Sequence, residues 1–335
     1  MLLVVGAKAV GGQIQRAMKD VTELLGIRYP VLQGGMAWVA EHRLAAAVSN
    51  GGGLGVIAGG SADADYVRGQ IRKARELTDK PFGINIMLMS PFAEDLVQLV
   101  IDEKADVVTT GAGNPGKYME ALKTAGVKVI PVIASAALAK RMERAGADAV
   151  IAEGCEAGGH IGEITTMNLV PQAADAVSIP VIAAGGIADG RGAAAAFMLG
   201  AKGVQVGTRF VCAAEAVVSQ AFKDRIIAAG DTDTVVTGRF TGHPVRVLRN
   251  KLTREILSKE KEEISLEEFE EIMSGTLRKA VVDGDTDYGS LMAGQSAGLV
   301  TRIQPAAGIL EDIIEGMYAV YASLGGYMGQ EARHA

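Results

Sequence analysis

The chain has 335 residues, of which 49% are hydrophobic and 21% are charged. This length can bury a large core and accommodates one large barrel with an insertion. The formal net charge of −6 provides no overall basic field for nucleic acid. No apolar run approaches the roughly 18 uncharged residues that a membrane helix needs. Composition therefore argues against nucleic-acid binding and against a membrane span.

The N-terminal segment begins apolar but is broken at Gly6, so its apolar stretch is too short for the core of a signal peptide. A second plausible start lies at Met18, and we expect residues 1–17 to be an artificial addition or a mis-set start. Cys155 and Cys212 could form at most one disulfide, and two thiols in a chain this long fit a reducing compartment. We therefore expect a cytoplasmic protein.

Short apolar runs rich in β-branched residues alternate with amphipathic segments. Each run is almost continuously apolar, as in strands buried on both faces of a parallel sheet. The eight predicted strands are Pro30–Gly35, Gly53–Ala58, Phe82–Met87, Val107–Gly111, Lys128–Ile133, Ala149–Gly154, Pro180–Gly186 and Gly203–Thr208. Helical patterns include Asp63–Thr78, Pro91–Glu103, Pro115–Ala125 and Ala134–Ala145. This alternation predicts an α/β fold, a closed (β/α)8 TIM barrel, over a doubly wound sheet, which usually has fewer strands.

The alternation stops after Phe210. Residues 224–290 contain no further barrel strand and include the charged stretch LSKEKEEISLEEFEEIM, which is typical of a solvated helix. We expect them to form a small α-rich domain, a substrate or lid domain inserted beside the barrel mouth after the eighth strand. The barrel itself would then comprise residues 18–223 and 291–335, with a closing helix over Ala306–Leu324.

The loops AAGGI and QVGT follow the predicted seventh and eighth strands, where barrels of this type often bind phosphate. Gly185-Gly186 and Gly207-Thr208 would offer backbone N–H groups to one phosphate. A helix starting near Asp189 would add its dipole. Either loop alone could be a simple tight turn, but together they predict a phosphate site at the barrel mouth.

His160 lies in EGCEAGGHIGE, after the predicted sixth strand. A lone histidine is often structural, but at the mouth its imidazole could donate or accept a proton near neutral pH. The four histidines are scattered without the spacing of a metal site, so no metal site is predicted. Cys155 could be a nucleophile, although a packed small residue is the simpler interpretation. His160 is therefore the candidate catalytic residue.

The string GAGNPGKY matches G-x-G-x-x-G and most of a P-loop. Tyr118 stands where a P-loop needs Ser or Thr, and no acidic residue follows at the distance that the dinucleotide fingerprint requires. We interpret the string as a glycine-rich mouth loop with Pro115 at a helix start.

The segment GRFTGHPVRVLRNKLTRE is basic within an acidic protein. It could dock an anionic partner or a cofactor phosphate, or it could be a solvated helix face. Its cations are Arg239, Arg246, Arg249, Lys251 and Arg254.

Several strings together resemble the flavin-dependent enoyl-acyl-carrier-protein reductases of bacteria, within the wider nitronate monooxygenase (2-nitropropane dioxygenase) superfamily. They are QGGMAWVA, PFGINIMLMSPF, TTGAGNP, AEGCEAGGHIG, IPVIAAGGIADG, QVGTRF and MAGQSAGLV. The resemblance runs from about Met18 to about Tyr321. AEGxEAGGH and AAGGI are shared across the superfamily, whereas TTGAGNP, LTRE and MAGQSAGLV are more particular to the reductases.

The resemblance implies one FMN per chain, NADH or NADPH as co-substrate, a homodimer and, often, activation by a monovalent cation such as K⁺ or NH₄⁺. It also implies that acyl carrier protein carries the substrate, as in bacterial fatty acid synthesis. His160 matches the active-site histidine of these reductases, which would donate a proton or polarise the thioester carbonyl. The implied flavin-binding residues are Gly35, Met36, Ala37, Asn85, Glu153, Gly185, Gly186, Gly207, Thr208, Met292 and Gln295.

Three functions remain in view. The first is reduction of trans-2-enoyl thioesters by NAD(P)H through FMN. The second is nitronate oxidation, in which oxygen reoxidises the flavin and NAD(P)H is not needed. The third is flavin binding without turnover, which a histidine at the mouth disfavours.

Overall fold

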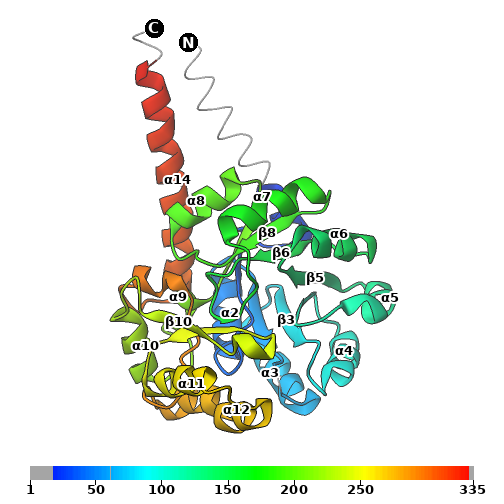
Figure 1. Ribbon diagram of the computed structural model, residues 1–335. Helices are drawn as coiled ribbons and strands as arrows, with labels where there is room; N and C mark the ends of the chain where they lie inside the picture. Colours follow the sequence, from blue (N-terminus) through cyan, green and yellow to red (C-terminus); the bar gives the residue numbers. More distant parts are fainter. Residues whose placement is uncertain (1–17, 61, 332–335) are drawn as a thin grey trace.

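The computed structural model describes residues 18–60 and 62–331, so the prediction for residues 1–17 lies outside the described part (Figure 1). Eight parallel strands form one barrel in the order β1-β9-β8-β6-β5-β4-β3-β2, which confirms the predicted fold. Each strand lies within its predicted run. The strands are β1 (Val31–Gln33), β2 (Gly55–Ala58), β3 (Phe82–Met87), β4 (Val107–Gly111), β5 (Lys128–Ile133), β6 (Val150–Glu153), β8 (Val181–Ala184) and β9 (Gly203–Val206).

Helices surround this barrel (Figure 1). They include α2 (His42–Asn50), α3 (Ala64–Leu77), α4 (Ala93–Asp102), α5 (Met119–Thr124), α6 (Ala136–Arg144), α7 (Thr166–Ala176) and α8 (Gly190–Met198). Side-chain caps explain where several begin, because Asp63 and Ser135 each accept a backbone N–H of the first turn. The predicted helix over 115–125 is divided, since a 3₁₀ turn η1 (Pro115–Tyr118) precedes α5.

The side chain of Gln33 supplies hydrogen bonds between β1 and β2, the two strands that close the barrel. Strand β1 is only three residues long, and its ladder to β2 is reduced to Leu32 opposite Leu54. The fully buried Gln33 side chain accepts from the N–H of Val56 at 3.1 Å and donates to the Val56 carbonyl at 3.2 Å. Its side-chain amide therefore pairs backbone groups that a longer strand would otherwise satisfy.

The barrel interior is apolar below and polar near the carboxyl ends of the strands. Apolar residues of one cluster, including Val107, Ile130, Ile151 and Ile182, fill the lower part. Side chains alternate along a strand, so inward-facing positions recur at every second residue. Four strands carry a polar residue at an inward position near their carboxyl ends, whereas β5 and β8 carry Val132 and Ala184 there. We call the four polar residues the polar layer: Asn85, Thr109, Glu153 and Gln205.

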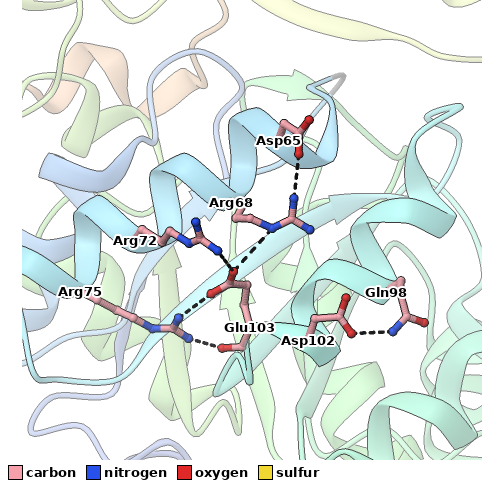
Figure 2. Close-up of polar contacts among 7 residues, drawn as sticks. All are labelled: Asp65, Arg68, Arg72, Arg75, Gln98, Asp102 and Glu103. Carbon is pink, nitrogen blue, oxygen red and sulfur yellow. Dashed lines mark hydrogen bonds and ion pairs between the residues drawn. The ribbon is translucent and has the colours of Figure 1, made fainter.

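Outside the barrel, three arginines surround Glu103, the residue after α4 (Figure 2). Arg75 and Arg72 lie on α3 and place guanidinium nitrogens 2.8 Å and 3.3 Å from the carboxylate oxygens of Glu103. Arg68 lies 3.6 Å from the same carboxylate and 2.7 Å from Asp65. This Glu103 cluster joins α3 to the end of α4 on the outer shell.

The segment after β9 is more mixed than the predicted α-rich insertion. It contains two strands that pair with the short β7 (Gly159–His160) in the order β10-β11-β7. Its elements are α9 (Thr208–Val211), α10 (Gln220–Ile227), β10 (Thr234–Thr237), η2 (Arg239–Thr241), β11 (Val245–Leu248), α11 (Lys251–Lys261), α12 (Leu266–Met273), α13 (Thr276–Arg278), the π-helical turn η3 (Lys279–Asp283) and η4 (Gln295–Leu299).

The prediction of one solvated helix for the charged stretch is wrong. Helix α11 ends at Lys261, and α12 begins only at Leu266. Between them Glu263 has a left-handed φ of 58°, and the Ser265 side chain caps α12 by accepting from the N–H of Glu268. The stretch therefore turns back on itself instead of continuing.

Helix α14 (Ala306–Glu331) extends beyond the predicted closing helix. Its first turns bury Ile309, Leu310 and Ile313, and it packs on α8 and α2. Close approach to α8 requires glycine, because a Cβ at Gly190 would lie 2.2 Å from the carbonyl carbon of Gly316. The far part of α14 projects away from the barrel (Figure 1). Among the described helices, α14 included, none combines the length and apolar character that a membrane crossing requires.

Candidate functional site

The loop after β1 crosses the polar layer at close range. A Cβ at Gly35 would lie 2.4 Å from the Cβ of Asn85, so this position admits only glycine. Asn85 is itself held by a 3.0 Å bond from its Nδ2 to Thr109 Oγ1. Further along the loop, the Met36 sulfur lies 3.7 Å from the Cβ position of Gly207. The structure thus brings four predicted residues from three strands together at the carboxyl ends of the barrel strands.

Ala37 follows in the same loop and lies 3.3 Å from the Cβ position of Gly60, after β2. The next residue, Trp38, has a left-handed φ of 66° and an exposed indole. Such a backbone conformation is unusual for a bulky residue. It places the ring near Arg278, whose guanidinium carbon lies 6.0 Å from the ring centroid.

The two glycine turns after β8 and β9 leave backbone donors free. Gly185 and Gly186 have left-handed φ values of 93° and 71°. Among the residues that the structure describes, the N–H groups of Gly185, Gly186 and Gly207 have no protein acceptor. Converging free N–H groups on turns of this kind form an anion-binding concavity. The geometry therefore fits the predicted phosphate site.

The N-terminus of α8 differs from the expected phosphate-binding helix end. The helix begins at Gly190, next to Asp189 as predicted. However, the Asp189 carboxylate already accepts from the N–H groups of Arg191 and Gly192, at 2.9 Å and 3.3 Å. Burial acts to raise the pKa of Asp189, but hydrogen bonds from the Arg191 side chain and from these two N–H groups together hold it below its usual value. The glycine turns, and not the capped end of α8, therefore keep backbone N–H groups free for a phosphate.

Glu156 and Thr166 support the glycine turn after β8 through hydrogen bonds, a role that the sequence did not predict. The Glu156 carboxylate accepts from the Thr166 N–H at 2.9 Å and lies 2.9 Å from the Thr166 hydroxyl. That hydroxyl also lies 3.0 Å from the Gly185 carbonyl oxygen. These contacts join the loop after β6 to the turn after β8. An acidic residue ten positions before a Thr at a helix start is the only sequence signal for this link.

Glu153 ends β6 and faces the barrel interior. It keeps some exposed surface, but the surrounding barrel wall removes enough water to raise the pKa of its carboxyl to about 7. Within residues 18–60 and 62–331, no group donates a hydrogen bond to this carboxyl. An acidic group with this pKa and without a partner is characteristic of a site that receives a ligand.

His160 lies on β7, a strand that exists only because β11 pairs with it. His160 stands opposite Val245, and Gly159 stands opposite Arg246. The Met292 sulfur lies 3.6 Å from the Cβ position of Gly159, on the other side of the strand. Loss of hydration and the neighbouring His243 lower the pKa of His160, so its imidazole is neutral near pH 7.

The segment 291–295 holds the loop after β6 in place. Met292 bridges Val247 of β11, and the Gln295 N–H donates to the Glu156 carbonyl at 2.9 Å. The Gly294 N–H donates to Thr208 Oγ1 at 2.9 Å. The segment that contains Met292 and Gln295 therefore contacts β11, Thr208 and the loop after β6. With these contacts, every predicted flavin-binding residue lies at a carboxyl strand end or on this segment.

The basic segment does not form one free patch. Arg246 is buried and donates to the Cys155 carbonyl at 3.0 Å, because the run VRVL is strand β11 rather than a helix face. Arg239 pairs with Glu163 and Lys251 pairs with Asp287, at 2.8 Å and 2.7 Å. Within the described chain, the remaining two cations of the segment form no ion pair. They are Arg249 and Arg254.

Cys155 is half-buried, and burial followed by repulsion from Glu156 raises the pKa of its thiol. A thiol with a raised pKa is a poor nucleophile, because the thiolate is the reactive form. Cys212 is buried away from the mouth, and burial raises the pKa of its thiol to about 11. The structure thus favours the simpler interpretation of Cys155 as a packed residue.

Comparison with known proteins places these features in a family. The family model for nitronate monooxygenase matches residues 18–98 and 91–316. A (3aS,4S,5R,7aS)-5-hydroxy-7a-methyl-1-oxo-octahydro-1H-indene-4-carboxyl-CoA dehydrogenase from Mycobacterium tuberculosis is 37% identical, over 89% of this chain and 96% of that protein. A probable nitronate monooxygenase from Staphylococcus aureus is 35% identical, over 88% of this chain and 96% of that protein.

Among solved structures, one has a higher sequence identity to this chain than these relatives have. FabK from Thermotoga maritima has 55% sequence identity and a TM-score of 0.90, covering 92% of this chain and 98% of that chain. Nitroalkane oxidase from Streptomyces ansochromogenes has 28% identity and a TM-score of 0.81, covering 92% and 99%. The predicted resemblance to the FMN-dependent enoyl reductases of this superfamily is confirmed.

The family implies bound FMN, and the mouth fits this group. Free amides of the glycine turns suit its phosphate, and the closest carboxylate behind them, that of Glu156, is engaged with Thr166. The loop backbone at Gly35 packs directly against Asn85 with no side chain between them, and a flat ring system needs such close backbone approach. The chain belongs to the nitronate monooxygenase family and is an FMN-dependent oxidoreductase.

Proposed function

We propose that this protein is an enoyl-[acyl-carrier-protein] reductase, which reduces trans-2-enoyl thioesters with NADH or NADPH through bound FMN. The likeness to FabK, at 55% identity over 92% of the chain, is the observation that supports this proposal most. The nitroalkane oxidase with the same fold shares only 28%. The strings TTGAGNP and MAGQSAGLV, which are more particular to the reductases, support the same choice.

His160 is the proposed catalytic residue. Its backbone is placed by pairing with β11, and its neutral imidazole can donate a hydrogen bond to the thioester carbonyl or relay a proton to Cα of the substrate. When bound, FMN supplies the hydride chemistry, while the barrel orients the reactants. The glycine amides would hold the FMN phosphate, and the polar layer would face the polar atoms of the rest of the cofactor.

Acyl carrier protein is the proposed partner, because it is acidic and carries the substrate in the reaction. The two cations without ion pairs, Arg249 and Arg254, are the remaining candidates for docking it. Reversing both charges (Arg249→Glu with Arg254→Glu) should weaken use of carrier-bound substrate more than use of a coenzyme A analogue, chiefly at low salt. Equal effects on both substrates would reject this docking site.

We also propose a homodimer and activation by a monovalent cation, both on the basis of the family resemblance. Light scattering of the purified protein would report the oligomeric state. Turnover with and without K⁺ or NH₄⁺ would report the cation effect.

A paired turnover assay tests the proposed reaction. The purified protein is given NADH or NADPH with crotonyl-coenzyme A in one arm, and a nitronate with oxygen in the other. The proposal predicts rapid consumption of NAD(P)H with crotonyl-coenzyme A. Turnover confined to the nitronate arm would instead establish the alternative, nitronate monooxygenase, which the Staphylococcus aureus relatives favour. Failure of both coenzymes to reduce bound FMN would favour a flavin-binding protein without turnover.

A further inference from the structure

The pairing between β7 and β11 extends past the ends of both strands. The register places His160 opposite Val245. One step further, the Ile161 N–H donates to the Pro244 carbonyl at 3.1 Å, which continues the same antiparallel ladder. The next position in this register puts His243 opposite Gly162.

This register makes His243 a diagonal neighbour of His160. Residues two apart in an extended strand share a face, so His243 lies on the same face as Val245 and therefore as His160. Residues before proline favour extended backbone, which Pro244 imposes on His243. Diagonal neighbours are roughly 7 Å apart. Gly162 has no side chain to separate the two rings.

The other charged groups around His160 are already engaged. On the loop after β7, Glu163 pairs with Arg239 of η2 at 2.8 Å. On β11, Arg246 alternates to the opposite face, where it donates to Cys155 and Thr234. In the loop after β6, Glu156 accepts from Thr166, and the Cys155 thiol is neutral because its pKa is raised. His243 is exposed and faces His160 without such a partner among the described residues.

We propose that His243 is a positioning residue that holds His160 as the neutral imidazole during the proposed enoyl reduction. A positive charge on His243 opposes a second positive charge on its diagonal neighbour His160. Loss of hydration is the main cause that lowers the pKa of His160, although the residue keeps exposed surface, and repulsion from His243 is the other cause. Neutral His160 keeps one ring nitrogen as a donor, which can hydrogen-bond the thioester carbonyl, and the other as an acceptor, which can take up a proton that the ring then relays to Cα. The inference rests on the proposed function for its purpose but not for its measurement.

The test is an NMR titration of the FMN-loaded protein labelled in its histidines, with the His160 signal assigned from His160→Asn. Three proteins are compared: the unchanged chain, His243→Gln and His243→Lys. Removing the charge should raise the His160 titration midpoint by roughly half to one pH unit, and a permanent charge should lower it by a similar amount. His42→Gln is the matched control and should leave the midpoint unchanged, because His42 lies on α2 and bonds to Gln70.

If His243 had a purely structural role, the His160 titration midpoint would shift in the same direction in both variants or in neither. Either result would overturn the proposal. The unchanged chain supplies an independent check that needs no variant. Higher salt screens the repulsion, so its His160 midpoint should rise between low and high ionic strength. A midpoint independent of salt would also contradict the proposal. Because these readouts do not use turnover, they can succeed even if the enoyl reductase assay fails.

Discussion

Glu103 on the outer shell and Glu153 at the barrel mouth are both glutamates at the end of a secondary-structure element, yet their surroundings are opposite. Glu103 meets three arginines, Arg68, Arg72 and Arg75 (Figure 2). Glu153 receives no hydrogen bond from the described chain, and burial raises the pKa of its carboxyl to about 7. Proteins satisfy most buried polar groups internally, so those left open mark where a ligand completes the site.

The largest expected effect is a loss of enoyl turnover when His160, at the barrel mouth, is replaced. His160→Ala should keep FMN but reduce enoyl turnover by about 10²- to 10⁴-fold, because oriented proton transfer or carbonyl polarisation is lost. Steady-state kinetics together with the flavin absorbance measure both quantities. Glu103→Gln on the shell is the control and should keep full turnover. Undiminished activity of the His160→Ala protein would remove His160 from the mechanism.

Replacing the unpartnered carboxyl should stabilise the flavin-free protein at high pH. The pKa of Glu153 is about 7 in the folded state against 4.5 for the ordinary group. Below the lower value both states are protonated, and as pH rises toward 7 the unfolded chain ionises first, so folding stability is lost. Glu153→Gln removes this penalty, which is up to about 3 kcal/mol above pH 7 and small near pH 5.

Urea unfolding of the flavin-free protein at pH 5 and at pH 8 measures the difference. A gain in stability that is equal at both pH values would show that Glu153 is not the group that titrates.

The glycine turn after β8 should be sensitive to a single methyl group. At Gly185 a Cβ would lie 2.8 Å from the Gly154 carbonyl oxygen, and φ is 93°. Gly185→Ala should weaken FMN binding by about tenfold, since a left-handed L-residue costs roughly 1–2 kcal/mol and would shift the amides. Gly146→Ala is a matched control, with φ of 98° and nothing within 4 Å of the new Cβ. Fluorescence titration with FMN should show weaker binding only for the first variant.

The smallest expected effect is a loss of stability when the Glu103 cluster on the outer shell is changed. Glu103→Gln should lower the free energy of unfolding by about 1 kcal/mol, because ion pairs with solvent-exposed arginines are individually weak and only the network adds to them. Thermal unfolding at low and high salt measures this loss, which should shrink as salt rises. A loss of several kcal/mol, or a loss of FMN, would mean that the two regions are not independent.

The barrel could be predicted from the sequence because its strands are buried on both faces and read as separate apolar runs. The two glycine turns and His160 could be placed at the mouth for the same reason, since the topology fixes where strand ends lie. The family resemblance, and not the periodicity, supplied FMN and the flavin-binding residues.

The small sheet β10-β11-β7 could not be predicted, because its formation depends on pairing between segments that are distant in the sequence. Strand β7 is only Gly159–His160, too short to show an alternating pattern. Strand β11 has an apolar alternation around Arg246, but the surrounding positive charges suggested either a docking patch or a solvated helix face. Burial of Arg246 and the link between Glu156 and Thr166 are properties of the folded chain that local sequence does not encode.

Anaerobic reoxidation of the flavin tests the central claim most directly. The FMN-loaded protein is first bleached with NADH or NADPH in the absence of oxygen, and one equivalent of crotonyl-coenzyme A is then added. The account predicts that the oxidised flavin spectrum returns at once and that butyryl-coenzyme A forms in equal amount. A flavin that stays bleached until oxygen is admitted would contradict it.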